Sequence, residues 1–570
     1  MRKLTSLSIC ALILPIALFA QTTGKISGTV KGSDGTPLVA ANVVITGTSQ
    51  GSSSDKEGNF VILNVPVGSY AVRVDYIGYK SVTVSNTEVK GGLTANVNFT
   101  LSPSAVSGEE VVIVGEKRLV EPSATNSVRT VSAEDIGNSA SRSVSGILDL
   151  QPGVVILNGQ LHIRGSREEE VGYTLDGADI KDPISSGRLV TAIPEALSEI
   201  AVEAGGYGAD IGGSNSGIVR QTMKTGGNEL VGSVRMESGS YGYNDLTATI
   251  SGPAGPVKYF MAFRKKHEDD YDPTFYNEFK IDMDGDGMAD VLPSYVSGVT
   301  PDGDSISVAF DPDAGIKSRW SDDISFNGTA LIDLGGPLSF RLSGVIDNSK
   351  YMSNSLPIYN MFNTERLPER SINKMVLGAR ANYFVNPSFL ISGGISMLNR
   401  DYESYDGLFG KPADFGGAVS WGDSASVSGN GIDVSGWTSS YMRTVDKDYN
   451  DYYVGQFAFA RPGDITTGWS VSSRESMAFD VMAALQKGAH ELKAGFESKS
   501  YEYRSYYLST SAIYNVNRII AEDTTLTRAN AVSGNNADIT EALSIYNRSG
   551  NIGYDDYGNE VDDKWDGPRK

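Results

Sequence analysis

The chain has 570 residues, with 48 Lys and Arg against 69 Asp and Glu, and a net charge of −21 at pH 7. A chain this acidic is repelled by a phosphate backbone, which excludes nucleic acid as a partner. Hydrophobic residues make up 40% of the sequence and nowhere run for the ~18 positions that a membrane helix needs, which excludes a helical membrane protein. This length predicts several domains.

The first twenty residues have the pattern of an export signal. Arg2 and Lys3 precede an apolar run at residues 7–16, and a small residue closes the segment. A positively charged start, a short apolar core and a small residue at the cleavage point are typical of a signal peptide. We expect residues 1–20 to be removed and the mature protein to lie outside the cytoplasm. The only cysteine, Cys10, leaves with the signal, so the exported chain has no disulfide.

Residues 25–101 contain short β-prone runs separated by Gly, Pro, Asp and Asn turns. This pattern predicts a small β-sandwich of antiparallel strands. The stretches at residues 28–30, 37–43, 55–60 and 65–70 resemble the carboxypeptidase regulatory-like domain. We expect the two sheets to close around seven apolar side chains, which are Val30, Val43, Ile45, Phe60, Ile62, Val72 and Val74.

The resemblance to a peptidase accessory domain does not predict an enzyme. A catalytic zinc site needs clustered ligands, and the three histidines of the chain, His162, His267 and His490, stand far apart in sequence and outside any zinc motif. We expect no catalytic residues, and the first domain is interpreted as an accessory module.

Residues 102–121 are predicted to be a linker that contains one β-prone run. The run consists of Glu110, Val111, Val112, Ile113 and Val114, with polar residues on both sides and no strand nearby in sequence to pair with. It is therefore predicted to be an exposed strand that awaits pairing. In position and character it resembles the TonB box, which implies binding to a TonB-like energy-coupling protein. A strand that merely links two domains remains the alternative.

Residues 122–230 are predicted to form an α+β domain. Ser132 with an acid three residues later predicts a helix start, and apolar positions at 144, 147 and 148 predict a second helix that ends before Pro152. The motifs at 161–165, 173–177, 205–212 and 217–227 follow one another in the order of the TonB-dependent receptor plug, which this region resembles. Residues 219–222 depart from the family, which usually has an apolar or Asn-containing strand there.

The resemblance also implies which plug residues meet the surrounding wall. The Ile-Arg-Gly and Asp-Gly motifs are expected to seat the plug through Arg164, Gly165, Asp176 and Gly177. Arg164 and the acidic residues 168–170 form the main charge cluster of this domain and are candidates for pairing with charges on strands. The alternative is that both glycines make β-turns and that the charges are solvated.

From residue 231 onward, apolar and polar residues alternate with a period of two, as in strands with two different faces. Short turns at 335–337 and 386–387 alternate with long polar loops, which is typical of a transmembrane antiparallel β-barrel in outer-membrane lipid. Nine candidate strands lie near residues 232, 244, 257, 323, 338, 375, 388, 476 and 490. Because a plugged barrel has about 22 strands, residues 231–570 are expected to be the N-terminal part of a truncated barrel.

A candidate metal site lies in the long loop after the third strand. Asp282, Asp284 and Asp286 alternate before a glycine, and Asp290 follows. This spacing resembles an Asp-x-Asp-x-Asp-Gly calcium loop, although Pro293 stands where an EF-hand has its bidentate Glu. The two interpretations are a weak structural Ca²⁺ site and a solvated acidic loop. We expect no other cofactor.

Together these patterns predict a TonB-dependent outer-membrane receptor that takes up an external ligand by movement of its plug. By resemblance, the ligand is a siderophore, a cobalamin-like cofactor, an oligosaccharide or a peptide, and the loops do not select among these. The alternative is a periplasmic or surface scaffold protein that is built from the sandwich and plug-like domains and transports nothing.

Overall fold

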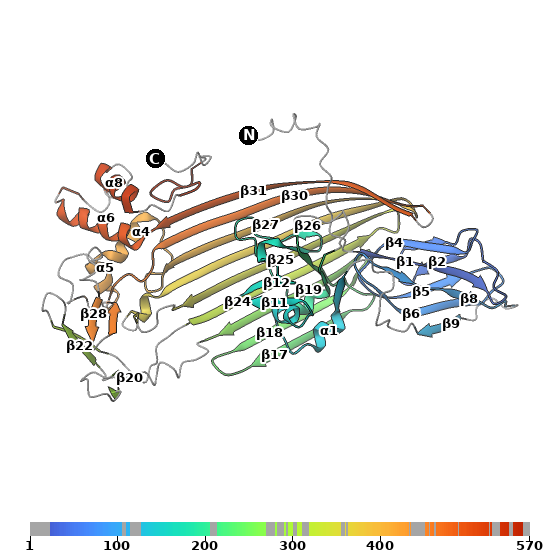
Figure 1. Ribbon diagram of the computed structural model, residues 1–570, viewed down its shortest axis with the longest axis horizontal. Coiled ribbons are helices and arrows are strands. Elements are labelled where there is room, and N and C mark those ends of the chain that lie inside the picture. The colour runs from blue at the N-terminus through green and yellow to red at the C-terminus, as the bar shows by residue number, and fades with distance from the viewer. Residues whose placement is uncertain are drawn as a thin grey trace.

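Figure 1 shows the chain as a computed structural model, which describes residues 23–561 except for a set of gaps. Left out are residues 105–109, 115–126, 206–213, 270–279, 282–289, 292–294, 300–304, 310–318, 355–358, 361–362, 433, 435–450, 455–456, 461–462, 488–489, 524, 527–529, 531–535 and 547–550. The expected signal peptide lies outside the described residues. A β-sandwich, a small α+β domain and a wide sheet follow one another along the chain.

The N-terminal domain is a sandwich of a four-stranded and a five-stranded sheet. In the first sheet, β1 pairs with β4, β7 and β8. The second sheet has the order β3-β2-β5-β6-β9. The strands are β1 (Thr23–Gly32), β2 (Asn42–Ile45), β3 (Gly51–Ser53), β4 (Asn59–Pro66), β5 (Gly68–Asp75), β6 (Ser81–Val89), β7 (Thr94–Asn96), β8 (Phe99–Leu101) and β9 (Glu110–Val114).

All seven apolar side chains expected inside the sandwich are buried in one core cluster, together with others such as Phe99 and Leu101. The prediction of purely antiparallel strands is wrong, because β7 and β8 both pair β1 in parallel and β9 pairs β6 in parallel. Residues 94–101 form two short strands, of which β7 pairs the first half of β1 and β8 the second half.

The second domain is built on a five-stranded sheet with the order β10-β15-β16-β13-β14 and a separate hairpin, β11-β12. Its elements are β10 (Val128–Ser132), α1 (Ala133–Asn138), α2 (Val144–Asp149), β11 (Val154–Leu157), β12 (Gln160–Ile163), η1 (Glu168–Glu170), β13 (Val171–Leu175), β14 (Ala178–Asp179), η2 (Pro194–Ala196), β15 (Leu197–Glu203) and β16 (Gly217–Met223).

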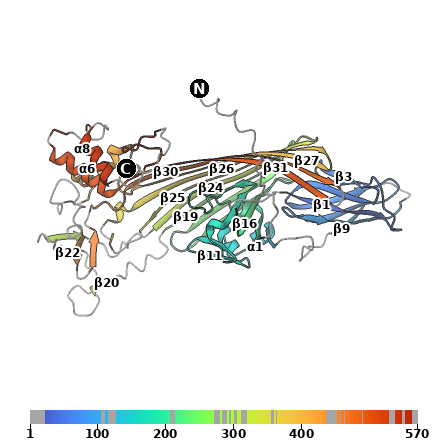
Figure 2. The ribbon, with the colours of Figure 1, turned by 45° about the horizontal axis from the view of Figure 1, so that its top comes forward.

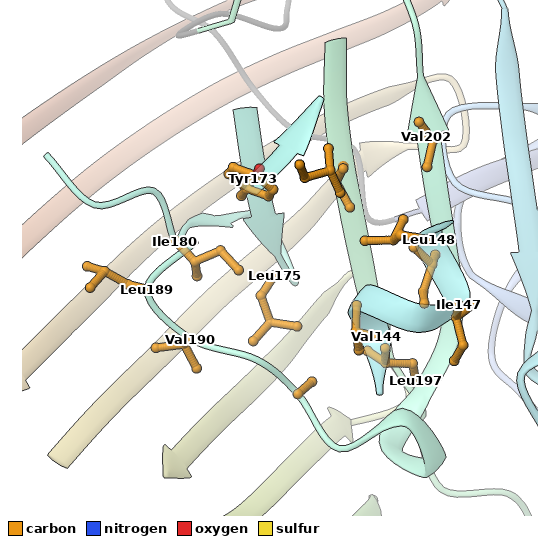
Figure 3. Packing of buried hydrophobic residues seen from close by; sticks show 14 of the residues in the cluster. Val144, Ile147, Leu148, Tyr173, Leu175, Ile180, Leu189, Val190, Leu197 and Val202 are labelled. Atoms are coloured by element: carbon orange, nitrogen blue, oxygen red, sulfur yellow. The ribbon is translucent and has the colours of Figure 1, made fainter. Parts of the chain in front are cut away.

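Local sequence explains the helices of this domain. Ser132 caps α1 in a capping box with Asp135, as its spacing predicts. The apolar positions of α2, Val144, Ile147 and Leu148, are fully buried because they share one helix face. Figure 3 shows this helix packed against side chains of the domain's central sheet, which together form its core.

Nine strands form the wide sheet, each antiparallel to the next in chain order. Their positions confirm the nine strands predicted from alternation. They are β17 (Val231–Ser238), β18 (Asn244–Ala254), β19 (Val257–Glu268), β24 (Arg319–Asp333), β25 (Leu338–Ser353), β26 (Pro368–Asn386), β27 (Phe389–Asp406), β30 (Trp469–Lys487) and β31 (His490–Leu508).

The α+β domain lies against one face of this sheet (Figure 2), and its core continues into Val345, Val376 and Leu398 of the strands. On β25, Leu342 and Ile346 are exposed, whereas Arg341 on the opposite face contacts the α+β domain. The alternation predicted for this strand therefore separates an exposed apolar face from a polar face that holds the small domain, as expected of a wall between lipid and lumen.

The two ends of the sheet differ. At the short-turn end, three residues or fewer join most neighbouring strands and the sandwich lies beside them, whereas the long connections carry helices and small strands at the other end (Figure 1). The helices and small strands of the long connections are β20 (Lys280–Ile281), β21 (Asp290–Val291), β22 (Tyr295–Val299), β23 (Ser305–Ala309), η3 (Thr364–Arg366), α4 (Phe415–Val419), η4 (Ser420–Gly422), α5 (Ser424–Gly429), β28 (Asp451–Val454), β29 (Phe457–Ala460), α6 (Thr510–Glu522) and α8 (Ala537–Tyr546).

The helices at this end have a core of their own, in which Trp421 and Ile513 are buried. Arg366 is fully buried beneath them, 2.7 Å from the Asp406 carboxylate, and donates to the Trp421 carbonyl at 2.9 Å. A buried pair of this kind holds its position only with further hydrogen bonds, which the carbonyls here supply. None of the helices that the structure describes is long and apolar enough to cross a membrane.

Candidate functional site

The α+β domain is seated on the sheet through a carboxylate in a tight turn. Asp176 and Gly177 join β13 to β14 with φ angles of 49° and 86°, which is left-handed backbone of the kind that Asp and Gly tolerate. The Asp176 carboxylate is 1% exposed and lies 2.8 Å from the Arg341 guanidinium of β25. It also accepts from the backbone N–H of Met223 at 2.9 Å, so the same side chain fixes β16 and the wall.

Three more carboxylates of this domain reach cations on the strands. Asp179 lies 2.9 Å from the Lys499 ammonium of β31. Two further ion pairs join Asp182 to Arg474 on β30 and Glu195 to Arg235 on β17. With Arg341 these cations come from four different strands, so the contacts spread across the whole sheet. We call the four acid–base pairs the seat, defined by Asp176–Arg341, Asp179–Lys499, Asp182–Arg474 and Glu195–Arg235.

The Ile-Arg-Gly motif lies elsewhere. Arg164 and Gly165 have φ angles of 53° and 77° and form a turn after β12. Arg164 is exposed, and in the part of the chain that the structure describes it makes no ion pair with a strand. Of the two predicted seating motifs, the structure thus brings only the Asp-Gly turn to the sheet. In the acidic cluster, burial and the neighbouring Glu169 carboxylate raise the pKa of Glu168.

The TonB-box-like run forms a strand, but it is not unpaired. β9 lies parallel to β6, with Ser81 opposite Glu110 and Ser85 opposite Val114, and the Ser85 hydroxyl donates to the Ile113 carbonyl at 3.3 Å. The prediction of a strand awaiting its partner is wrong in this respect, since the sandwich supplies that partner. β9 is the last strand of its sheet, and Val112 and Ile113 are 62% and 49% exposed.

The predicted calcium loop belongs to the long connection between β19 and β24. Asp282, Asp284 and Asp286 lie outside the described residues, and Asp290 is placed only as backbone at the start of β21. Among the described side chains, no group of three or more His, Cys, Asp or Glu is arranged to hold a metal ion.

A buried charged face joins the sandwich to the α+β domain. Glu199 and Glu203 of β15 share one face of the sheet with Arg220 of β16, and the Arg220 guanidinium lies 2.5 Å from Glu203. The turn after β6 covers this face. The N–H of Gly91 lies 3.3 Å from the Glu199 carboxylate, and its carbonyl accepts from Arg220 at 3.2 Å.

Burial governs the titration of Glu199. Removal from water raises its pKa to about 7, and this effect outweighs the opposing ones of Arg220, the Gly91 N–H and Lys90. The Glu88 carboxylate adds to the rise. The carboxyl therefore changes charge near neutral pH while it is covered by the sandwich.

Beside this contact lies a cavity of about 960 Å³. Its walls come from the sandwich, from the α+β domain and from the short turns of the sheet, and include Tyr70, Glu199, Lys258, Arg341 and Pro387. Burial raises the pKa of the Tyr70 phenol to about 12. The sandwich is thus held at a few points around an open space.

Sequence reasoning missed most of the seat and the whole charged face. Asp179, Asp182 and Glu195 carry no signal apart from their charge, because their partners lie tens to hundreds of positions away. Arg220 had a signal. It belongs to the segment 219–222 that departs from the plug pattern, and the structure explains the departure by its ion pair with Glu203 and its contact with the sandwich.

Comparison with known proteins identifies two domains. Residues 26–113 match the family model described as CarboxypepD_reg-like domain, which includes most of β9, and residues 121–219 match the TonB-dependent Receptor Plug Domain. The TonB-dependent transporter Oar of Myxococcus xanthus is 30% identical over 234 residues, 38% of this chain and 22% of that protein. The TonB-dependent receptor SusC of Bacteroides thetaiotaomicron is 26% identical over 254 residues, 41% of this chain and 24% of that protein.

Among solved structures, the ferripyoverdine receptor of the outer membrane of Pseudomonas aeruginosa matches with a TM-score of 0.42 and 12% identity, over 67% of this chain and 43% of that one. The chain covers 22% and 24% of the length of the two curated relatives named above. The domains and the strand-built wall define an outer-membrane protein with a plug. The chain thus carries a TonB-dependent receptor plug domain, and the curated proteins to which it is similar are TonB-dependent transporters and receptors.

Proposed function

We propose that this protein takes up an external ligand through energy-coupled movement of its plug. The observation that carries the proposal is the seat, in which four plug carboxylates are paired with cations on four strands. A plug domain that never moved would need no such arrangement, since apolar packing alone would hold it against the sheet. Ion pairs can part and re-form when the plug moves, provided that water or the ligand solvates the charges that are left.

The asymmetry of the sheet supports inward transport across the outer membrane. Short turns face the periplasm in outer-membrane proteins of this kind, and long loops face the exterior. The helices around Trp421 then lie outside, where a ligand arrives, and the sandwich with β9 lies in the periplasm. β9 is there within reach of a TonB-like coupling protein, which can add a strand of its own to an exposed edge.

The ligand class stays open among siderophores, cobalamin-like cofactors, oligosaccharides and peptides. The names of the two curated relatives, Oar and SusC, specify none of them. No reaction is assigned to the protein, and the similarity to a carboxypeptidase regulatory-like domain concerns an accessory module.

The test of this proposal is the Val112→Pro variant of the full-length receptor in its own bacterium. Proline removes a backbone donor and fixes φ, so strand pairing at β9 fails. With labelled candidates of the four ligand classes, we expect uptake to fall while binding at the cell surface persists. The matched control is Val39→Pro, a solvent-exposed loop position of the same domain that precedes β2. Unchanged uptake in Val112→Pro would contradict the assignment of β9 as the coupling segment.

A further inference from the structure

A row of basic residues crosses the face of the sheet that holds the plug. The plug core ends on three apolar wall residues that stand opposite one another on neighbouring strands, namely Val345, Val376 and Leu398. Side chains two positions further along a strand lie on the same face. The next row toward the long connections is basic on three adjacent strands, with Lys374 on β26, Arg400 on β27 and Arg474 on β30. We call these three residues the cation row.

The three cations of the row repel one another. Residues directly opposite on antiparallel strands have Cβ atoms about 5 Å apart, and like charges at that spacing are destabilising. The outer two have acids, since Lys374 lies 3.1 Å from the Asp347 carboxylate of β25 and Arg474 forms a seat pair with Asp182 of the plug. Between them, Arg400 forms no ion pair with an acid among the residues that the structure describes. One positive charge of the row is therefore not neutralised by these acids.

Tyrosine rings lie beside the two guanidinium groups of the row. Arg400 lies over the ring of Tyr402, 5.5 Å from its centre, and Arg474 lies over that of Tyr503 at 5.7 Å. A ring attracts a cation without accepting its N–H donors as a carboxylate does. Arg400 donates no hydrogen bond within the described part of the chain, and the Nε–H of Arg474 is buried there without an acceptor. These donors are available for an oxyanion, which a guanidinium binds in a fork.

The cation row also lies next to a loop of the plug. Asp182, the acid of Arg474, accepts hydrogen bonds from the backbone N–H groups of Ile184 and Ser185 and so begins this loop. The Ile184 side chain is 54% exposed. Because Arg400 stands opposite Arg474, a ligand held at Arg400 lies one strand away from the point where plug and wall meet. Such a ligand is placed to contact both.

We propose that Arg400, at the centre of the cation row, binds an oxyanion of the external ligand. The inference rests on the proposed function and names the charge of the substrate. Among the four classes left open, it selects members that carry a carboxylate or a phosphate, because a neutral oligosaccharide leaves the charge of Arg400 uncompensated. Carboxylate and phosphate present similar oxygens to a guanidinium, so the class is defined by negative charge.

Calorimetric titration of the full-length receptor in detergent tests the inference. The probes are citrate, inorganic phosphate and the neutral sugar maltose. We expect both anions to bind the natural protein, and Arg400→Gln to weaken their binding roughly tenfold or more, since it removes a charge-assisted hydrogen-bonded pair. Tighter binding of citrate than of phosphate would point to carboxylate groups on the ligand, and the reverse to phosphate groups. Either order supports the proposal.

Arg504→Gln is the matched control, because it makes the same change in net charge. Arg504 follows Tyr503 on β31, so it lies on the opposite face of the sheet, where Glu502 and Glu560 pair with it. Anion binding should stay as in the natural protein. Equal weakening in both variants would reveal a general charge effect and overturn the proposal. Binding of maltose alone, or no binding of either anion at millimolar levels, would overturn it as well.

Thermal unfolding checks that the variants are folded. Arg400→Gln relieves repulsion within the row, so we expect it to be at least as stable as the natural protein. If it does not fold, Arg400→Lys takes its place, which keeps the charge and loses the fork of donors. This variant should bind both anions more weakly than the natural protein, and unchanged binding would contradict the role of Arg400.

The failure of this inference and that of the proposed function are seen in different measurements. The titration is made at equilibrium and without a coupling protein, so its result does not depend on whether β9 is the coupling segment. Failure of the proposed function would show instead as unchanged uptake in Val112→Pro, with anion binding at Arg400 unaffected.

Discussion

The docking of the sandwich on the plug is predicted to depend on pH through Glu199. In the docked structure, burial raises the pKa of this carboxyl to about 7 from its ordinary value of 4.5. When the sandwich leaves, water reaches the carboxyl and the pKa returns toward 4.5. The docked state therefore binds the proton more tightly than the undocked state.

The magnitude follows from the two pKa values. The difference between 4.5 and about 7 corresponds to about 3 kcal/mol of extra preference for the protonated form in the docked state. Because the pKa is raised on docking, this contribution is fully present below pH 4.5 and is lost as the pH rises through about 7. We expect the sandwich to be held more tightly at pH 5 than at pH 8.

Hydrogen exchange at the Gly91 amide measures this docking, since the N–H is protected only while it faces Glu199. Protection, corrected for the intrinsic pH dependence of exchange, should fall by roughly a hundredfold between pH 5 and pH 8, as about 3 kcal/mol implies. Glu199→Gln keeps an acceptor but cannot titrate, so its corrected protection should be flat. Glu229→Gln, at an exposed acid of the same domain, is the matched control and should behave like the natural protein. Equal slopes in the natural protein and Glu199→Gln would refute the reasoning.

Three further outcomes are expected. Asp176→Ala leaves the Arg341 guanidinium buried without its carboxylate and should lower the free energy of unfolding of the plug by about 3–5 kcal/mol, seen as faster hydrogen exchange in β13 and β16. Arg366→Ala leaves the fully buried Asp406 carboxylate without its partner and should destabilise the helices of the long connections by about 3–5 kcal/mol. Limited proteolysis should then cut α6 earlier than in the natural protein, with the plug unaffected. Calorimetric titration with CaCl₂ should give heat at millimolar levels that Asp284→Asn abolishes, and no heat in the natural protein would exclude a calcium site.

Sequence patterns predicted the wall in detail because its strands carry the signal themselves. In β25 and β26, apolar or small residues alternate with polar ones or glycine over residues 338–343 and 377–383, and Leu342, Ile346 and Leu377 lie exposed on the apolar face. The caps of the plug helices were equally local, since Ser132 and Asp135 are three residues apart. Features of this kind are complete within one element, so a single sequence contains them.

Features that join distant elements could not be read in the same way. β9 was interpreted as unpaired because no strand lies beside it in sequence, whereas its partner β6 begins 29 residues earlier across two short strands. The strands of the seat lie up to 320 positions from their plug acids. The helices α6 and α8 were not predicted from the sequence, and in the structure their apolar residues pack on one another around Ile513.

The four pairs of the seat have acids on the plug and bases on the wall, whereas Arg142 of the plug and Glu237 of β17 pair in the opposite sense. A plug transplanted from a relative would meet four cations and would have to offer an acid to each of them. Where it offered a neutral or basic residue, the cation facing it would lose its partner, and the chimera would fold with a loosened plug. Plug and wall are therefore a matched pair in this chain, and a designer who exchanges plugs between such receptors should move the four wall cations together with the plug.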